Sequence, residues 1–437
     1  MTCQTCSDRK LGGSKDILRI REVNRDMSEN REAFNDWVNT LNEKLLNKGN
    51  SINNNCKANT KSSTNFFYLK FGDTLASYDP DVYSFSCDLS PDGLPTGKGV
   101  ITRSKTWVWP KCSGFNSWPV IEKSTKLHSM EGFWENGISS GLQAFTYCNG
   151  VTFHTVFEFG VAQGLAVGSF KEKIIWVGRY MDGQLMGEFC SIEPDAGALL
   201  LGDMVDGEMS GPDLTFLYPD LETGLRGSWQ GGVMVAARQV VVNCVWVEDD
   251  QVRVSCSASF GPEFAFAPSE VDNFGASDPM MKDPFESKYI AVEESTMEGG
   301  GQGVYAKVDL PKNRIAAIFN GYKISLYAGI SPAEGIEEEE KIYERLSYNI
   351  HMPEDEDFFI DLPPSKADLS VYCASLGHKV NHSFIPNCRF GTMFHPRWGR
   401  VRTVETMEEV EEGQELLVDY GYDLLRCPEW YRELWTR

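Results

Sequence analysis

Three segments in the last third of the sequence carry residue types that could act together in one site. The first is a glycine-rich turn, Glu298–Ala306, which runs into an apolar stretch. The second, Gly377–Cys388, holds two histidines, two asparagines and a thiol, and the third, Glu415–Asp423, ends an apolar stretch in two tyrosines. Glycines let a backbone approach a ligand closely, and amides, imidazoles and phenols can orient that ligand.

Each segment is ambiguous when it is considered alone. The glycine turn lacks the basic residue of a phosphate-binding GxxxxGK[ST] loop. His378 and His382 have no third ligand at a zinc spacing, so the sequence predicts no metal site. A nucleophile that pairs Cys388 or Cys373 with a histidine is an alternative, and so is a core loop whose polar groups are all satisfied. Only the joint order of the three segments favours a single site.

That order resembles the SET-domain protein lysine methyltransferases. NHSFIPNC at 381–388 matches the family's NHS-x-x-PNC signature, and ELLVDYGYD at 415–423 matches its EL-x-x-x-YGYD signature. The glycine turn that ends in GVYA resembles the family's first cofactor strand. The resemblance covers about residues 283–437. It implies small curved β-sheets around a pseudoknot, with the last signature passing beneath the NHS segment, and S-adenosylmethionine as methyl donor.

The resemblance also implies roles for single residues. The cofactor-binding residues would be Gly300, Gly301, Gln302, Asn381, His382, Trp430 and Glu433. The catalytic residues would be Tyr420, Tyr422 and His382, and the lysine channel would be lined by Phe319, Asn349, Phe390 and Tyr420. Gln302 replaces an acidic residue that is usual in the nearest relatives. The spacing from Trp430 to Glu433 is one residue shorter than in those relatives. The family's flanking zinc clusters are missing because Cys427 stands alone, so no metal is expected.

The expected chemistry explains these residue types. Methyl transfer from a sulfonium to an amine requires alignment and desolvation more than a strong base. An apolar and aromatic channel lowers the pKa of the substrate amine, and a tyrosine hydroxyl, which we predict to be that of Tyr420, can orient its lone pair.

Two departures from the family pattern concern the product. Phe319 and Phe390 stand where the nearest relatives carry channel tyrosines. In SET enzymes, phenylalanine at the latter position acts as a product switch, so we predict more than one methyl addition. The alternative is a catalytically weak or inactive scaffold that binds protein partners.

The sequence upstream of these three segments is repetitive. The unit Gly132-Phe-Trp-Glu-Asn-Gly137 recurs in altered form with first positions at 155, 178, 202 and 227. Each unit alternates apolar or aromatic residues with polar ones, and most turn on Asn-Gly or Asp-Gly, as a tight β-hairpin requires. Stacked hairpins bury a face that none could bury alone. The pattern resembles MORN repeats, so the chain from about Asp81 onward resembles the MORN-plus-SET type.

The predicted fold is therefore mainly β, with stacked β-hairpin MORN repeats followed by a SET-domain β-fold with a pseudoknot, and with an N-terminal helical segment. Apolar residues from Ile17 to Leu45 recur near the helical period and predict that segment. The predicted limits are 1–80 for the helical segment and linker, 81–250 for the repeats, 251–282 for a connector, 283–425 for the SET domain and 426–437 for a C-terminal segment that closes the cofactor site.

Charge points to the kind of partner. The 437-residue chain has 63 Asp and Glu against 41 Lys and Arg, a formal net charge of −22. Residues 131–232 contribute −10, from four basic and fourteen acidic side chains. This charge disfavours direct binding to nucleic acid or anionic lipid and favours lysine-rich partners such as histone tails. Acidic runs at 337–340 and 354–357 are either solvated loops or a groove that steers basic tails.

Cysteine use and hydropathy indicate the compartment. Twelve cysteines are dispersed along the chain, as is typical of reduced thiols. No stretch is long and apolar enough to span a membrane. We expect a soluble monomer of the nucleus and cytoplasm, and its association with chromatin follows from the resemblance.

Overall fold

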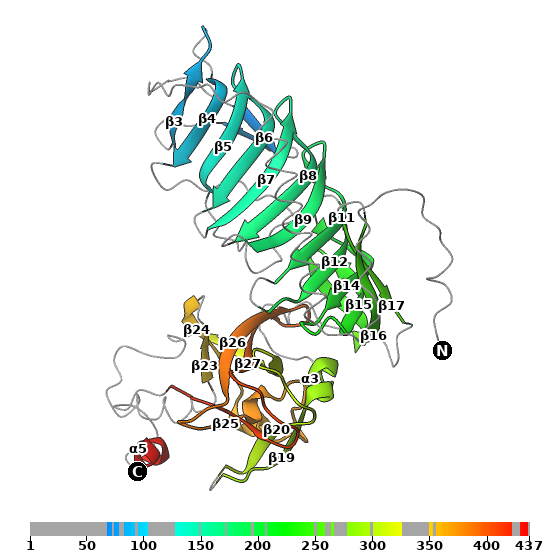
Figure 1. Cartoon of the computed structure of the whole chain (residues 1–437), viewed down its shortest axis with the longest axis vertical. Coiled ribbons are helices and arrows are strands. Elements are labelled where there is room, and N and C mark those ends of the chain that lie inside the picture. The colour runs from blue at the N-terminus through cyan, green and yellow to red at the C-terminus, as the bar shows by residue number, and fades with distance from the viewer. Residues whose placement is uncertain are drawn as a thin grey trace. The chain divides into compact units, whose positions relative to one another are not determined.

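In the computed structural model of the chain, most of the described residues lie in β-strands, which confirms the mainly β prediction (Figure 1). It describes residues 68–71, 74–77, 83–91, 95–103, 127–147, 150–170, 173–193, 196–205, 208–248, 251–257, 264–265, 278–297, 300–325, 349–352, 355–421 and 429–435. These divide into two compact units. Unit 1 comprises the described parts of 1–110, 126–190 and 241–258, and unit 2 those of 191–240 and 259–437.

Unit 1 consists mainly of antiparallel strands in sequence order, although its first strand also pairs in parallel with its eighth. Its strands are β1 (Tyr68–Phe71), β2 (Thr74–Ser77), β3 (Tyr83–Leu89), β4 (Pro95–Arg103), β5 (Leu127–Glu135), β6 (Ile138–Tyr147), β7 (Val151–Glu158), β8 (Val161–Phe170), β9 (Lys173–Met181), β10 (Gln184–Leu185), most of β11 (Gly187–Ile192), and β17 (Gln251–Cys256). From β3 to β9 each strand pairs with the next. The strands therefore follow the order of the repeats.

The repeat pattern accounts for the burial along these strands. The third residue of every repeat is buried, and these residues are Trp134, Phe157, Tyr180, Met204 and Trp229. The residue that follows is exposed in each case, at Glu135, Glu158, Met181, Val205 and Gln230. Successive side chains on a strand point to opposite faces, so one face of each hairpin supplies the core.

The hairpin turns have the backbone conformation that tight two-residue turns require. Both central residues have positive φ in Asn136–Gly137 (49° and 84°) and in Asp182–Gly183 (50° and 82°), as in a type I′ turn. Glycine takes this conformation without a Cβ clash. The N–H of Gly183 donates to the Ala162 carbonyl at 3.0 Å, so neighbouring turns are joined to one another.

Unit 2 contains the last hairpins of the repeat series as well as the SET region. The hairpin strands are β12 (Leu199–Val205), β13 (Glu208–Met209), β14 (Gly211–Leu217), β15 (Thr223–Gln230), the first part of β16 (Val233–Glu248), and β18 (Phe264–Ala265). β14 pairs with β12 and β15, and β16 pairs with β17 and β18. β17 lies at the start of the predicted connector, because polar and apolar residues alternate along Gln251–Cys256 and extend the last hairpin. The predicted domain limits follow sequence similarity and remain predictions.

The SET region has two small sheets. Its elements are α3 (Pro284–Tyr289), β19 (Ile290–Glu294), β20 (Gln302–Ala306), β21 (Ile315–Phe319), β22 (Tyr322–Ser325), β23 (Asn349–Met352), β24 (Asp355–Asp361), the 3-10 turns η3 (Pro364–Lys366) and η4 (Gly377–Lys379), β25 (Asn381–His382), β26 (Cys388–His395), β27 (Gly399–Thr406), β28 (Glu415–Val418) and α5 (Glu429–Trp435). One sheet runs β19-β20-β28-β26-β27-β21, with β25 beside β28, and the other runs β22-β24-β23.

Several predictions fall outside the described residues. They are the N-terminal helical segment with its linker up to residue 67, the acidic run at 337–340, Glu354 and Tyr422. Residues 68–71 and 74–77, at the end of the segment predicted as helix and linker, form the strands β1 and β2. None of the helices among the described residues is long and apolar enough to cross a membrane.

Candidate functional site

Strand β28 brings the three predicted segments together. It pairs antiparallel with β20, where Tyr305 faces Glu415, and parallel with β25, where His382 faces Val418. The glycine turn lies directly before β20, and β25 is the start of the NHS segment. Segments more than a hundred residues apart in the chain therefore meet at one strand, and the two C-terminal signatures lie side by side as the SET pseudoknot requires.

The glycine turn is shaped by close contacts. The N–H of Ser295 donates to the Gly301 carbonyl at 2.7 Å, which closes the turn. A Cβ on Gly300 would lie 2.7 Å from the Ser295 hydroxyl oxygen and 3.1 Å from Nδ2 of Asn381, so this position has no room for a side chain. Gly301 has φ +58°, and a Cβ there would meet nothing within 4 Å. The turn is thus packed on one side and open on the other.

The carboxylate of Glu415 joins the turn to the NHS segment. It accepts hydrogen bonds from the Ser295 hydroxyl at 2.8 Å, the Tyr305 hydroxyl at 3.1 Å and Nδ2 of Asn381 at 2.9 Å. Nδ2 of Asn381 also donates to the Gln302 carbonyl at 3.2 Å. Glu415 therefore holds two predicted cofactor-binding segments at a fixed separation.

Asn387 ties the two signatures to each other. Its Nδ2 donates to the Glu415 carbonyl at 2.8 Å, and its Oδ1 accepts from the Leu417 N–H at 2.8 Å. The side chain thus pairs with the backbone of β28 as a neighbouring strand would. Sequence reasoning assigned no role to Asn387 or to Glu415, although both belong to the quoted signatures.

His382 is buried and is held as a neutral acceptor. Its Nδ1 accepts from the Tyr420 N–H at 3.1 Å, which leaves the ring proton on Nε2. Burial lowers the pKa of His382, and the charge of Asp419, 3.7 Å from Nδ1, opposes this only in part. The imidazole therefore adds no positive charge to the site at neutral pH.

The phenol of Tyr420 has a fixed direction. Its hydroxyl donates to the Val380 carbonyl at 2.7 Å, directly before the NHS segment. The ring lies 5.3 Å from the His382 ring, centre to centre. With its proton engaged in this bond, the phenolic oxygen keeps lone pairs that can accept from a substrate N–H.

The C-terminal helix α5 packs against the NHS segment through a residue that sequence reasoning did not assign. The Tyr431 ring lies 4.7 Å from the His382 ring and 5.0 Å from that of Phe384, and its hydroxyl donates to Asp419 at 3.3 Å. Glu433 is exposed on the same helix, and Trp430 lies on it next to Tyr431, although the description does not extend to the Trp430 side chain.

The predicted channel residues come from different strands of the SET region, with Phe319 on β21 and Phe390 on β26 of one sheet, separated by β27, and Asn349 on β23 of the other sheet. Phe319 ends β21, is buried, and packs against Ile360 and Ile350. Phe390 lies on β26, two residues after Cys388. Cys388 pairs with Val418 of β28, and Tyr420 follows Val418 by two residues. The Arg402 guanidinium lies 5.7 Å from the Phe390 ring centre. Asn349 begins β23, but its side chain is not among those described, so its channel role remains a prediction.

Known proteins match both halves of this arrangement. Residues 301–421 match the family model of the SET domain, and residues 180–252 match that described as "Histone H3 K4-specific methyltransferase SET7 N-terminal". The histone-lysine N-methyltransferase SETD7 of Halocynthia roretzi is 31% identical over 268 residues, which make up 59% of this chain and 67% of that protein. The chain belongs to the SET-domain lysine methyltransferases of the MORN-plus-SET type.

Solved structures that match this MORN-plus-SET chain are less similar to it in sequence. The structure "ctPRC2 in an autoinhibited conformation bound to S-adenosylmethionine" is 21% identical and covers 34% of this chain and 17% of that chain, with a TM-score of 0.23. The Chaetomium thermophilum polycomb repressive complex 2 is 18% identical and covers 33% of this chain and 16% of that chain, also with a TM-score of 0.23. The match thus spans only a small part of those longer chains.

The described part of this SET methyltransferase contains no group of three or more His, Cys, Asp or Glu side chains placed to hold a metal ion. Burial raises the pKa of Cys388, to about 12, and also raises that of Cys373, which disfavours a thiolate at either position. The cysteine-nucleophile alternative therefore loses support, whereas the absence of a metal stays a prediction.

Proposed function

We propose that this chain transfers methyl groups from S-adenosylmethionine to lysine side chains of basic protein tails, histone tails among them. The observation that carries the proposal is the junction at β28, where Glu415 holds the glycine turn against Asn381 and where His382 and Tyr420 are hydrogen-bonded to each other's segment. This junction unites backbone for cofactor binding with an oriented phenol.

The residues present fit the cofactor. The glycine turn is open where a Cβ on Gly301 would project, so a ligand can approach its backbone closely. A neutral His382 avoids placing a second cation beside a sulfonium. We infer that Gly300, Gly301, Gln302 and the backbone of Asn381 and His382 hold the cofactor, with Trp430 and Glu433 of α5 closing over it. When bound, the cofactor supplies an electrophilic methyl group on sulfur.

Tyr420 orients the amine in this proposal. Its oxygen accepts a hydrogen bond from an N–H of the uncharged lysine while its own O–H donates to the Val380 carbonyl. Held in this way, the nitrogen lone pair would point toward the methyl group that a bound cofactor would supply, and its transfer from sulfur to nitrogen would carry the positive charge to nitrogen. In the proposal, Phe319, Phe390 and Asn349 would line the channel together with Tyr420, and Tyr422 would be a further catalytic residue of that channel.

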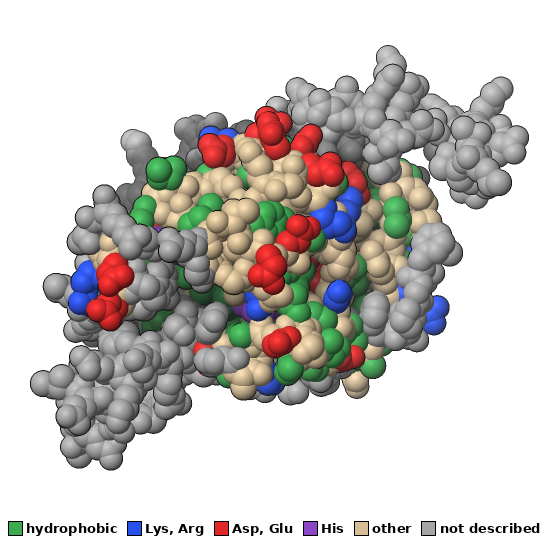
Figure 2. All heavy atoms as spheres, turned by 90° about the horizontal axis from the view of Figure 1, so that it is seen from below, with side chains coloured by type: hydrophobic (Ala, Val, Ile, Leu, Met, Phe, Trp, Pro, Cys, Tyr) green, Lys and Arg blue, Asp and Glu red, His purple; other side chains and the backbone are tan. Residues whose placement is uncertain are grey.

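Charge supports a basic substrate. The net charge is −22, and Figure 2 shows Asp and Glu side chains spread over the visible described surface, with Lys and Arg side chains interspersed singly. Such a surface attracts lysine-rich tails and repels nucleic acid. A monomer of the nucleus and cytoplasm that acts at chromatin accords with this substrate class.

Methyl transfer from labelled S-adenosylmethionine to a histone mixture tests the proposal. We expect label on lysine, a loss of kcat in Tyr420→Phe with cofactor binding retained, and weaker cofactor binding by calorimetry in His382→Ala. Cofactor binding by the wild-type chain without any transfer would instead support the second candidate, a scaffold that binds protein partners.

The number of methyl groups has a separate test. Phenylalanine at 319 and 390 leaves space that a tyrosine hydroxyl and its bound water would fill, so we propose that the product carries more than one methyl. Intact-mass analysis of an exhaustively treated lysine peptide should show added masses of two or three methyl groups. Phe390→Tyr should accumulate the monomethyl product, and a wild-type reaction that stops at one methyl would refute the idea.

A further inference from the structure

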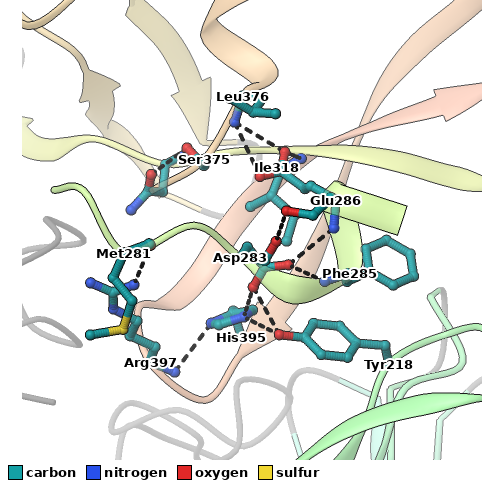
Figure 3. Close-up of polar contacts among 12 residues, drawn as sticks. Tyr218, Met281, Asp283, Phe285, Glu286, Ile318, Ser375, Leu376, His395 and Arg397 are labelled. Carbon is teal, nitrogen blue, oxygen red and sulfur yellow. Dashed lines mark hydrogen bonds and ion pairs between the residues drawn. The ribbon is translucent and has the colours of Figure 1, made fainter. Parts of the chain in front are cut away.

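We propose that Glu286 is a positioning residue for methyl transfer, because its buried side chain holds the end of β21, which carries Phe319, against the segment that leads into Asn381 and His382. The inference rests on the proposed function for its catalytic meaning. Figure 3 shows Glu286 between Ile318 and Leu376.

The side chain of Glu286 bridges two backbone segments. Its Oε1 accepts from the Ile318 N–H at 2.6 Å and from the Leu376 N–H at 3.1 Å, and Oε2 also lies 3.1 Å from the latter nitrogen. Ile318 directly precedes Phe319, and Leu376 is followed by η4 and then by the NHS segment. One carboxyl group thus sets the distance between a predicted channel wall and a predicted cofactor-binding segment.

The two segments approach each other closely beside Glu286. A Cβ on Gly377 would lie 2.6 Å from the Ile318 carbonyl oxygen and 2.8 Å from the Phe319 nitrogen, so only glycine fits there. Four residues after Leu376, the Val380 carbonyl receives the Tyr420 hydroxyl. A shift at Leu376 therefore moves the group that orients the proposed catalytic phenol.

Glu286 acts as an acceptor in this position. The residue is 1% exposed, and burial together with the charge of Asp283 raises its pKa well above the usual range. A protonated carboxyl group still offers its carbonyl oxygen to both N–H groups. The proposal accordingly requires an acceptor at this point and does not require a charge.

Helix α3, which carries Glu286, is itself anchored at its N-cap residue, Asp283. Asp283 caps it by accepting from the N–H groups of Phe285 and Glu286 at 2.9 Å and 3.3 Å. The other carboxylate oxygen of Asp283 accepts from the Tyr218 hydroxyl at 2.8 Å and from Nε2 of His395 at 3.1 Å.

The far end of α3 is anchored as well. The Tyr289 hydroxyl donates to Asp220 at 2.9 Å, and Lys288 forms an ion pair with the same carboxylate at 3.4 Å. Tyr218 and Asp220 both lie between β14 and β15, so the last hairpins of the repeat series hold the helix that presents Glu286.

The test compares Glu286→Leu, which removes the acceptor but nearly keeps the volume, with Glu286→Gln, which keeps an acceptor oxygen. Glu193→Leu is the matched control, because Glu193 is a fully buried carboxylate of the same unit and pairs with Arg400 at 2.8 Å. In the full chain we expect Glu286→Leu to lower kcat at least about tenfold, because small misplacements near a reacting centre are costly. Glu286→Gln should restore most of it, and Glu193→Leu should keep kcat within about twofold.

A second readout separates this inference from the proposed function. Amide hydrogen exchange at Ile318 and Leu376 should quicken about tenfold or more in Glu286→Leu but not in the control, because both N–H groups lose their acceptor. If the wild-type chain transfers no methyl group, the proposed function is refuted. The exchange rates of the Ile318 and Leu376 amides then still show whether Glu286 holds the two segments together.

Two results would overturn the role of Glu286. One is a Glu286→Leu variant whose kcat and amide exchange rates equal those of the wild type. The other is an equal loss of kcat in Glu286→Gln and Glu286→Leu. If Glu286→Leu does not fold, Glu286→Asp takes its place, because a side chain shorter by one methylene cannot reach both N–H groups.

Discussion

The hydrogen bond between Tyr218 and Asp283 should contribute measurably to the stability of unit 2. Tyr218 is fully buried, and its hydroxyl donates to Asp283 at 2.8 Å. Burial and the neighbouring carboxylates raise the pKa of Tyr218 well above its usual range, so the hydroxyl keeps its proton. In Tyr218→Phe the ring can remain stacked on Phe285, where the centres are 5.0 Å apart, and only the hydroxyl is lost.

The magnitude follows from the kind of bond. A buried hydrogen bond to a carboxylate contributes about 1.5–3 kcal/mol, so Tyr218→Phe should lower the free energy of unfolding of this region by about 2 kcal/mol. The N–H of Arg397 donates to Nδ1 of His395 at 3.2 Å, so the proton of that ring is on Nε2 and donates to Asp283. Asp283→Asn places an NH₂ group opposite donors and should cost about 3 kcal/mol.

Native-state hydrogen exchange of the β14 and β15 amides is the suitable assay, because a chain of two compact units need not unfold in one step. The control is Tyr218→Phe in the Asp283→Asn background, where it should cost less than about 1 kcal/mol. The two substitutions should therefore be coupled by about 1–2 kcal/mol. Strictly additive effects, or a cost of Tyr218→Phe below about 0.5 kcal/mol, would refute the reasoning.

Two further predictions concern pH and the cofactor turn. Burial, reinforced by Lys379, lowers the pKa of His378 from 6.5 to about 4, so between these values the unfolded chain binds a proton that the folded chain does not. The free energy of unfolding should therefore fall as pH drops through this window, by about 3 kcal/mol in all. In urea unfolding, the free energy of unfolding of His378→Leu should change with pH by about one proton less than that of the wild type. An unchanged slope would contradict the assignment. Glu415→Gln retains one acceptor for the three groups that converge there, so calorimetry should show cofactor affinity about tenfold weaker. Equal affinity in Glu415→Gln and wild type would show that Glu415 does not hold the turn.

Local patterns predicted the repeats because their cause is local. The spacing of glycines and aromatic residues forecasts the turn at Asn136–Gly137, whose two positive φ values the structure contains, and the burial of Trp134 and its equivalents. A strand period of two and a turn that needs left-handed residues can both be recognised within ten residues. The mainly β class could therefore be predicted from the sequence alone.

The site was predicted in part. The two signatures identified Asn381, His382 and Tyr420, and the structure places all three beside β28. The sequence analysis assigned no role to Tyr431, because its packing against His382 depends on where α5 docks. The amphipathic pattern of a short helix does not specify the surface on which it packs.

By itself, the sequence determined which chemistry-bearing segments exist, in which order they occur, and that stacked hairpins precede them. Only the tertiary structure decided that the last hairpins pack with the SET region and that α3 links them to the site. Tyr218 and His395 are 177 residues apart, yet both contact Asp283. The physical reason is that a buried carboxylate is stable only where donors converge on it, and donors drawn from distant strands leave no periodic pattern in the chain.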